Sequence, residues 1–387
     1  MMENLVQTIK NSVQTSMDSH FEHLHRHPEV AFEEQNSAKY IVDKLRQYGY
    51  EVFEGIGKTG VVGRLKNGDG IASIGLRADT DALPIVEKTD LPYKSKIEGK
   101  AHLCGHDAHT AMLLGAAEYL AEHKPFNGTL YLIFQPAEEI MGGAVAMLKD
   151  GLLEKFPMQA MFGLHNMPSL ELGKIHFTVG PIMAAVDNWE IKLTGVGSHG
   201  SMPEKAIDPV VAGAALVMSL QTIVSRNVAA KDSAVVTIGA FQSGTVGNII
   251  PQEAVLRLST RTARPETRER VLNRIREITR LTAEAYEVKY EISESQPGAV
   301  LVNDPENTER ATAVAQKVLG EANVVNPGPT FMGSEDFAFF AQQIPCVYGF
   351  IGNGDTPMVH HPEYVFNRSN LPLGAAYWVG IVQEYLK

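Results

Sequence analysis

Three short apolar runs constrain the fold of this chain more than any other feature of the sequence. They are "ASIGLRAD" at 72–79, "GTLYLIFQPAEE" at 128–139 and "QAMFGLHNMP" at 159–168, and helical patterns separate them. Apolar runs of this length that alternate with helices are typical of buried strands in a parallel sheet. The sequence therefore predicts a layered α/β domain.

Each run ends in side chains that can do chemistry. Asp79 ends the first run, Glu138 and Glu139 end the second, and His165 stands near the end of the third. The carboxyl ends of parallel strands meet at one edge of a sheet, where ligands bind in open α/β folds. We therefore expect these residues to converge.

A different pattern begins near residue 184. "VDNWEIKLTGVG" alternates apolar and polar residues, apart from a slip at 187–188, as a half-exposed antiparallel strand does. The pattern then predicts a helix at 206–225, strands at 234–241 and 253–262, a helix at 266–286 and a strand at 287–293. The order β-α-β-β-α-β is ferredoxin-like, and it predicts a satellite domain at 184–296.

The α/β pattern resumes after this satellite. It predicts helices near 305–320, from Ser334 and from residue 371, and a buried strand at 346–352. The satellite is thus expected to be inserted into a larger catalytic domain made of residues 1–183 and 297–387. A chain of 387 residues is also longer than a single hydrophobic core usually supports.

The stretch "HLCGHDAH" at 102–109 is unusually rich in metal-capable side chains. Cys104 and His106 precede a probable helix start, where Gly105 lets the backbone turn both donors inward and Asp107 can cap the helix. Thiolate and imidazole together favour a metal such as zinc. His102 and His109 are left as further contacts, and the alternative is a capped turn with a buried cysteine.

Other donors complete the predicted site. Because adjacent carboxylates at a strand end point in different directions, Glu139 can bind metal while Glu138 acts as general base. His165 is expected to be a ligand, and either His360 or His361 in "MVHHPEY" could close the coordination sphere. Asp79 is expected to orient a ligating histidine, with a turn cap as the alternative.

Two loops and a strand of the satellite carry candidates for substrate contact. His199 lies in "GVGSHGSMPEKAIDP" and Asn248 in "GTVGNIIP", and Arg261 lies in the strand that follows. A histidine on a loop over a metal site could stabilise an oxyanion, and a guanidinium suits a carboxylate. "GSEDFAFF" at 333–340 is a weaker candidate for substrate contact.

Charge and cysteine content exclude several classes of partner. With 34 basic against 45 acidic residues, the net charge of −11 is the wrong sign for nucleic acid or an anionic membrane surface. The longest apolar stretch, near 210–220, is too short to span a bilayer, and no signal peptide is evident, so a cytoplasmic location is expected. Two cysteines, Cys104 and Cys346, are too few for a disulfide framework.

Nine motifs in order along the chain resemble the amidohydrolase branch of the aminoacylase/carboxypeptidase metallopeptidase family. This branch includes hippurate hydrolases, N-acetyl-diaminopimelate deacetylases and plant indoleacetyl-amino-acid hydrolases. The motifs are "HRHPEVAFEE", "LRADTDALPI", "HLCGHDAHTAMLLGAA", "FQPAEE", "GLHNMP", "GSHGSMPEKAIDPV", "GNIIP", "MGSEDFAFF" and "HHPEY".

The resemblance implies a fold and a site. The fold is a mixed-sheet, metallo-exopeptidase-like catalytic domain with an inserted lid and dimerisation domain, which forms a homodimer or tetramer. The site is a pair of divalent ions held by Cys104, His106, Glu139, His165 and His361. Zinc or manganese is expected, with cobalt or nickel as the alternatives. Glu138 is the implied general base and Asp79 stands behind the site. Positions that match His199, Asn248 and Arg261 contact substrate, sometimes in the partner subunit.

The predicted activity is metal-dependent hydrolysis of the amide bond of N-acyl amino acids, with Glu138, Asp79 and His199 as the catalytic set. A metal-dependent carboxypeptidase or dipeptidase is the alternative within enzymes, since it uses the same constellation. A noncatalytic metal-stabilised binding protein is the alternative outside them.

Overall fold

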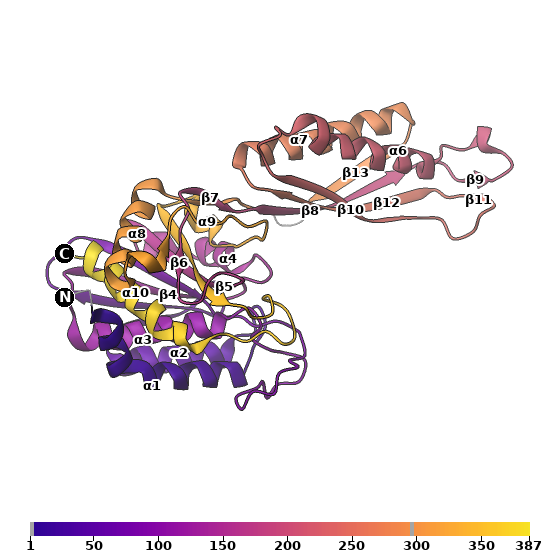
Figure 1. Ribbon diagram of the computed structural model, residues 1–387. Coiled ribbons are helices and arrows are strands. Elements are labelled where there is room, and N and C mark those ends of the chain that lie inside the picture. The colour runs from indigo at the N-terminus through magenta and orange to yellow at the C-terminus, as the bar shows by residue number, and fades with distance from the viewer. Residues whose placement is uncertain (1–3, 295–297) are drawn as a thin grey trace. The chain divides into compact units, whose positions relative to one another are not determined.

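The computed structural model describes residues 4–294 and 298–387, which divide into two compact units (Figure 1). The catalytic unit comprises Met1–Gly180, Val302–Pro329 and Asp336–Lys387, and the satellite unit comprises Pro181–Leu301 and Thr330–Glu335. The satellite unit therefore begins a few residues before the predicted position 184 and includes a short return segment. The predicted boundary at 296–297 lies outside the described residues.

The catalytic unit is built on an eight-stranded mixed sheet in the order β1-β2-β4-β3-β5-β16-β6-β15. The four central strands are parallel, and β2 and β6 pair antiparallel to their central neighbours. This strand order, with parallel and antiparallel pairs in one sheet, confirms the predicted α/β class and mixed sheet. The strands are β1 (Glu51–Ile56), β2 (Gly60–Asn67), β3 (Ser73–Asp79), β4 (Gly128–Gln135), β5 (Ala160–Pro168), β6 (Ile175–His176), β15 (Val324–Val325) and β16 (Cys346–Gly354), with the pair β7 (Gly180–Met183) and β14 (Leu301–Asn303) forming a separate ladder.

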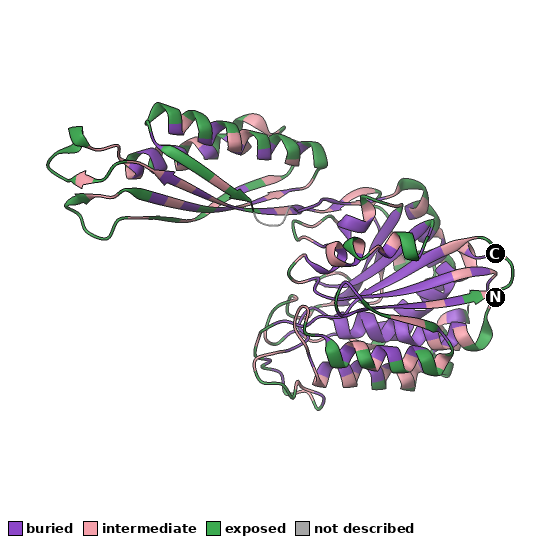
Figure 2. Cartoon of the chain, turned by 180° about the vertical axis from the view of Figure 1, so that it is seen from behind, coloured by how far each residue is buried: buried purple, intermediate pink, exposed green. Residues whose placement is uncertain are grey.

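Helices pack on this sheet in a layer around α3. Helices α3 and α10 contact β3, and α1 packs on both of them. Close packing of α1 on α3 requires Gly115, because a Cβ there would lie 2.3 Å from the Met17 side chain. Figure 2 shows the central strands of the large sheet as buried almost throughout. The helices are α1 (Leu5–Arg26), α2 (Gln35–Tyr48), α3 (His106–His123), α4 (Gly143–Lys149), α5 (Leu152–Lys155), α8 (Pro305–Leu319), α9 (Ala338–Ala341) and α10 (Leu371–Tyr385).

The satellite unit is a four-stranded antiparallel sheet in the order β10-β12-β8-β13, with α6 and α7 in the crossover connections. This order is the ferredoxin-like arrangement that the sequence predicts. Its core consists of side chains from both helices and the sheet. The elements are β8 (Ala185–Thr194), β9 (Ser198–His199), α6 (Pro209–Thr222), β10 (Ala234–Ser243), β11 (Ile249–Ile250), β12 (Glu253–Thr262), α7 (Pro265–Ala285) and β13 (Lys289–Glu294).

Strand β8 contains no bulge at the predicted slip. Its buried positions alternate regularly through Asp187, Trp189, Ile191 and Leu193. Asp187 therefore takes an inward position that an apolar residue would normally fill. The position is tolerated because Arg268 donates two hydrogen bonds, of 3.0 and 2.6 Å, to its carboxylate.

One predicted helix start is wrong. Ser334 does not open a helix, because α9 is a single turn that begins at Ala338. The Ser334 hydroxyl instead accepts a hydrogen bond of 3.0 Å from Arg261.

Helix α6 begins a long apolar segment of the satellite. With the π-helical turn that follows it, it forms a 19-residue segment, Pro209–Asn227, that is long and apolar enough to cross a membrane by length and composition alone. Ala212, Leu216 and Leu220 of this segment are fully buried in the satellite core. One face of the segment is therefore packed in the satellite core, whereas Val211 and Met218 of the same segment are exposed.

Candidate metal centre

The strand-end residues converge at the carboxyl edge of the central parallel strands. Ligand atoms of Asp79, His106, His109 and His165 all lie within 4.8 Å of one another, and those of Cys104, His106 and Glu139 do the same. Cys104 Sγ lies 3.4 Å from His165 Nε2. Residues from β3, α3, β5 and the loop after β4 are thus brought to one place.

The loop before α3 turns Cys104 and His106 into this cluster. Gly105 precedes the helix with a φ of 93°, which side-chain-bearing residues rarely adopt. Helix α3 begins at His106, so Asp107 lies in its first turn and does not cap it, contrary to expectation. Asp107 Oδ2 instead lies 2.7 Å from His25 Nδ1. His102, two residues before Cys104 in the same loop, is buried.

Two buried atoms in the cluster leave room for a cation. His106 Nε2 and Glu139 Oε1 are 3.9 Å apart, and neither has a hydrogen-bond partner among the described residues. Buried polar atoms of this kind are costly unless something satisfies them. Thiolate, imidazole and carboxylate are all ligands for zinc and related divalent ions, so the residues present fit a metal.

Asp81 orients His106. The ring Nδ1 of His106 lies 2.9 Å from the Asp81 carbonyl oxygen and 3.3 Å from Asp81 Oδ1, which leaves Nε2 for metal. Asp81 Oδ2 also accepts a hydrogen bond of 3.0 Å from the Glu139 backbone N–H. One carboxylate therefore positions two donors.

Asp79, which the sequence predicts to orient a ligating histidine, contacts His109 and Arg77. Its Oδ1 lies 2.7 Å from His109 Nδ1, and its Oδ2 accepts from Arg77 at 2.7 Å. Burial would raise the pKa of Asp79, but the electrostatic interactions with His106, Arg77 and His109, together with the hydrogen bond from His109, hold that pKa well below its usual range. Asp79 is therefore an ionised carboxylate beneath the site.

The two C-terminal histidines differ in orientation. His360 Nε2 lies 3.3 Å from Glu139 Oε2. His361 Nδ1 accepts a hydrogen bond of 3.1 Å from the backbone N–H of Glu363. The structure thus brings His360, rather than the predicted His361, to the metal-capable cluster.

Glu138 and Glu139 have different neighbours. Glu139 faces His106 and His360, whereas a Glu138 carboxylate oxygen lies within 4.8 Å of one from Asp336. The loop that carries them is tight, with positive φ at Ala137, just before Glu138, and at Met141, two residues after Glu139. Such a turn allows neighbouring carboxylates to diverge.

The satellite residues fall into two places. His199 on β9 pairs with Ile249 on β11, and the Gly200 N–H donates to the Asn248 carbonyl at 2.9 Å, so His199 and Asn248 are neighbours. Arg261 pairs with Val186 at the opposite end of β8. Thr194, at the end of β8 that leads to β9 and His199, lies eight residue steps along the strand from Val186, a distance on the order of 25 Å. The structure therefore does not bring Arg261 together with the other two.

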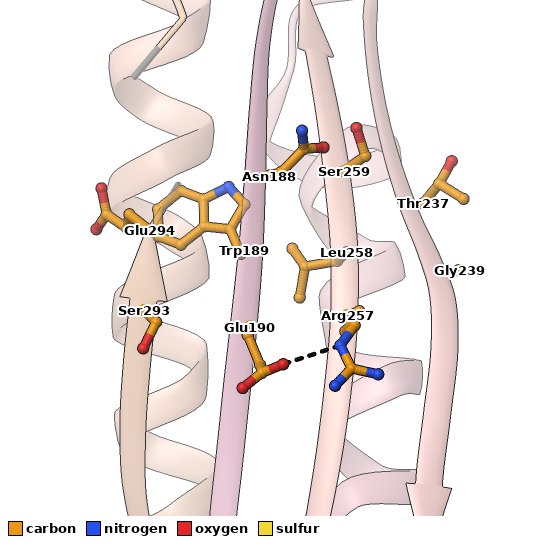
Figure 3. Close-up of a pocket in the computed structure, with 10 residues that line it drawn as sticks. All are labelled: Asn188, Trp189, Glu190, Thr237, Gly239, Arg257, Leu258, Ser259, Ser293 and Glu294. Atoms are coloured by element: carbon orange, nitrogen blue, oxygen red, sulfur yellow. Dashed lines mark hydrogen bonds and ion pairs between the residues drawn. The ribbon is translucent and has the colours of Figure 1, made fainter. Parts of the chain in front are cut away.

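A pocket of about 620 Å³ lies on the satellite sheet (Figure 3). Glu190 and Arg257 form an ion pair of 2.8 Å within it. None of the predicted site residues lines this pocket, so it is separate from the candidate metal centre.

Two of the metal-capable side chains, His165 and Cys104, have pKa values shifted by burial. Burial lowers the pKa of His165 well below its ordinary value, so its imidazole is neutral and ready to ligate. Burial raises the pKa of the Cys104 thiol well above its usual range. A metal must therefore displace a proton from Cys104.

A water-activating metal site at the carboxyl edge of an α/β sheet, with a second carboxylate beside it, is the arrangement of a metal-dependent hydrolase. The chain belongs to peptidase family M20/M25/M40, whose family profile matches residues 75–384.

Several family members resemble the chain over almost its whole length. Hippurate hydrolase of Campylobacter jejuni is 46% identical over 364 residues, which cover 94% of this chain and 95% of that protein. N-acetyl-L-cysteine deacetylase of Bacillus subtilis is 37% identical over 358 residues, covering 92% and 85%. The crystal structure of the Bacillus subtilis YXEP protein, described as a dinuclear metal-binding peptidase of family M20, matches with a TM-score of 0.85 and 33% identity over 97% of this chain and 99% of that one.

The sequence pattern did not predict that Asp81 holds both His106 and the Glu139 backbone. A signal for Asp81 existed, since it follows Asp79 by two residues directly after β3. Tyr364 lies four residues after His360, in the quoted motif "MVHHPEY", but nothing in that motif indicates that its hydroxyl is buried and donates a hydrogen bond to Asn166 Oδ1.

Proposed function

We propose that this protein hydrolyses the amide bond of N-acyl amino acids and releases a carboxylic acid and a free amino acid. The observation that carries the proposal is the pair of unsatisfied buried atoms, His106 Nε2 and Glu139 Oε1, beside a second carboxylate at Glu138. Similarity to hippurate hydrolase and N-acetyl-L-cysteine deacetylase supports this substrate class.

The proposed centre holds two divalent ions, zinc or manganese. Its proposed ligands are Cys104, His106, Glu139, His165 and His360, the last in place of His361. When bound, the ions supply Lewis-acid chemistry, polarising the amide carbonyl and lowering the pKa of the attacking water. Similarity to a dinuclear relative supports the count of two.

Proton transfer is assigned to Glu138. The carboxylate takes the proton of the attacking water and later delivers a proton to the leaving amine. The different neighbours of Glu138 and Glu139 support two separate roles for the two carboxylates. Asp81 and Asp79 hold the surrounding histidines in place.

The satellite supplies the substrate contacts in this proposal. His199 Nδ1 accepts a hydrogen bond of 3.1 Å from the Ser201 N–H, so the neutral ring carries its proton on Nε2 and can donate to an oxyanion. Arg261 is proposed to bind the substrate carboxylate. Because His199 and Asn248 lie far from Arg261 within one satellite, the proposal assigns them to the site of a partner subunit.

A homodimer through the satellite accommodates that assignment. Helix α6 exposes Val211 and Met218, which are 51% and 71% exposed, and β10 is the outermost strand of the sheet. Exposed apolar surface beside an unpaired strand edge is typical of an interface. A cytoplasmic location for the assembly also remains a proposal.

The test is a substrate panel. Enzyme stripped by a chelator and reloaded with zinc or manganese is assayed for free amino acid release from N-acetyl, N-benzoyl and N-indoleacetyl amino acids and from dipeptides. Metal-dependent release from one acyl class supports the proposal. Release from dipeptides alone assigns a peptidase instead, and metal loading with no release from any substrate contradicts an amidohydrolase and favours a binding protein.

A further inference from the structure

The proposed metal ligands come from segments that are far apart in the chain. They are the loop at 102–106, the end of β5 and the loop at 358–364, in addition to the Glu139 loop. Metal affinity depends on the spacing of these segments before the metal arrives, because ligands that must be moved into place weaken binding. The structure must therefore hold the segments together by contacts of its own.

We propose that Asn166 sets this spacing by forming hydrogen bonds to Cys104 and Tyr364, a connection that we call the Asn166 joint. We also propose that His109 is a positioning residue and not a metal ligand. The inference rests on the proposed metal centre and concerns residues to which that proposal gives no role. Asn166 directly follows His165 in β5 and is fully buried.

Asn166 uses its amide to connect two of the segments. Its Nδ2 donates a hydrogen bond of 2.6 Å to the carbonyl oxygen of Cys104. Its Oδ1 accepts a hydrogen bond of 2.6 Å from the hydroxyl of Tyr364, which is also buried. One side chain next to His165 thus fixes both the Cys104 loop and the loop that carries His360.

His109 supports Asn166 from the other side. The backbone N–H of Asn166, which can only donate, gives a hydrogen bond of 3.0 Å to His109 Nε2. The lone pair of Nε2 is therefore occupied, and the ring proton lies on Nδ1, which donates to Asp79 Oδ1 at 2.7 Å. Arg77, whose Nη1 lies 2.7 Å from Asp79 Oδ2, completes the support. Both nitrogens of His109 are used, so neither remains for a metal.

Gly105 makes room for this joint. A Cβ at this position would lie 2.2 Å from Asn166 Nδ2 and 2.8 Å from the Tyr364 hydroxyl. The glycine between Cys104 and His106 therefore serves two purposes. It allows the positive φ of the turn, and it lets the asparagine and tyrosine approach the ligand loop.

Replacing Asn166 by aspartate tests the joint with little change in shape. Asn166→Asp replaces the Nδ2 donor with an oxygen that faces the Cys104 carbonyl. We expect the affinity of the chain for Zn²⁺, measured by competition with a chromophoric chelator, to fall about 10- to 100-fold. In the Co²⁺-loaded protein, we expect the thiolate charge-transfer and d–d bands to shift, since both report the geometry around Cys104.

Asn303→Asp is the matched control. Asn303 is likewise fully buried in the catalytic unit, and its Nδ2 donates to the Tyr348 and Thr178 carbonyls at 2.9 and 3.0 Å. This variant should lower the thermal midpoint and leave Zn²⁺ affinity and the Co²⁺ spectrum unchanged. Equal losses of affinity in both variants would overturn the joint, because they would reflect general destabilisation.

Two further variants keep the test decisive. Tyr364→Phe removes one hydroxyl and should lower Zn²⁺ affinity in the same direction by a smaller factor, even if Asn166→Asp does not fold. His109→Gln retains an acceptor for the Asn166 N–H and should bind as many zinc ions as the unaltered protein. Loss of a whole zinc equivalent would make His109 a ligand and overturn that part of the inference.

The outcomes separate this inference from the proposed function. If the unaltered protein binds no metal, the proposed function itself fails. If it binds metal and hydrolyses its substrate while Asn166→Asp and Tyr364→Phe bind zinc equally well, only the joint is wrong.

Discussion

His360 points its Nε2 at Oε2 of Glu139, across 3.3 Å, although it is an exposed residue more than 200 positions away in sequence. Its neighbour His361 accepts a backbone hydrogen bond from Glu363 instead. Two adjacent histidines therefore have different environments, and only one of them is placed to share a cation with Glu139.

Substitution of each histidine tests this difference. We expect His360→Ala to lose bound metal and most of its activity, because a donor beside Glu139 is removed. His361→Ala should retain metal and activity to within a small factor. Metal content measured by elemental analysis after gel filtration checks both variants. The reverse pattern would restore His361 as the ligand.

Glu138→Gln should abolish turnover without loss of metal. The amide keeps the size of the side chain but cannot accept the proton of water, and loss of a general base typically costs about 10²- to 10⁴-fold in rate. Turnover and metal content are measured on the same preparation. Glu139→Gln is the matched control, and it should lose metal together with activity. Near-normal turnover in Glu138→Gln would remove this residue from the mechanism.

Metal affinity should rise with pH. Burial raises the pKa of the Cys104 thiol, so each binding event must expel its proton, and higher pH favours that release. We expect zinc affinity to increase by up to about tenfold per pH unit between pH 6 and 8. Cys104→Asp, whose carboxylate is ionised over this range in water, should show a flatter dependence. Equal slopes for the two proteins would contradict the assignment of Cys104.

His25 should stabilise the catalytic unit in a pH-dependent way. Its ring lies 2.7 Å from Asp107 Oδ2 and 3.4 Å from Glu87 Oε1. Burial lowers the pKa of His25, but these two carboxylates outweigh it and raise the pKa from 6.5 to about 9. The rise corresponds to roughly 3 kcal/mol, which is fully present below pH 6.5 and is lost as the pH rises through 9.

The measurement is the thermal midpoint of the metal-loaded protein and of His25→Gln at pH 6, 8 and 10. The midpoints should differ most at pH 6 and approach each other at pH 10. Comparing the two proteins at each pH removes effects of metal affinity that they share. A difference that stays constant across the range would show that the histidine acts through packing alone.

Mixing two inactive variants tests the assignment of His199 to a partner subunit. Glu138→Gln keeps His199, and His199→Ala keeps Glu138, so a mixed dimer contains one complete site if His199 acts across the interface. After subunit exchange, activity should recover to about a quarter of the normal value, because half the dimers are mixed and each has one working site.

Met218→Glu in both variants should prevent this recovery, since it places a charge on the exposed face of α6. Gel filtration should then show a monomer. Recovery of activity in the monomeric double variants, or no recovery in the dimers, would contradict the assignment.

Much of the fold follows from the sequence pattern. The runs at 72–79, 128–139 and 159–168 form β3, β4 and β5 within a residue or two at their starts, because burial on both faces of a sheet demands continuous apolar residues. The ferredoxin-like order of the satellite follows from its alternation of strands and helices. The irregularity predicted at 187–188 is absent from β8, and the sequence pattern does not indicate this because the pairing of Asp187 with Arg268 joins residues far apart in the chain.

The α/β class and the residue types gathered at the carboxyl edge can be predicted from the sequence, because periodicity and strand ends are local properties. The choice among chemically equivalent neighbours depends on the folded chain. The tertiary structure turned His360 rather than His361 toward Glu139, gave Asp81 rather than Asp79 to His106, and occupied both nitrogens of His109. Those choices depend on side-chain direction, which packing between distant segments sets and which no local pattern encodes.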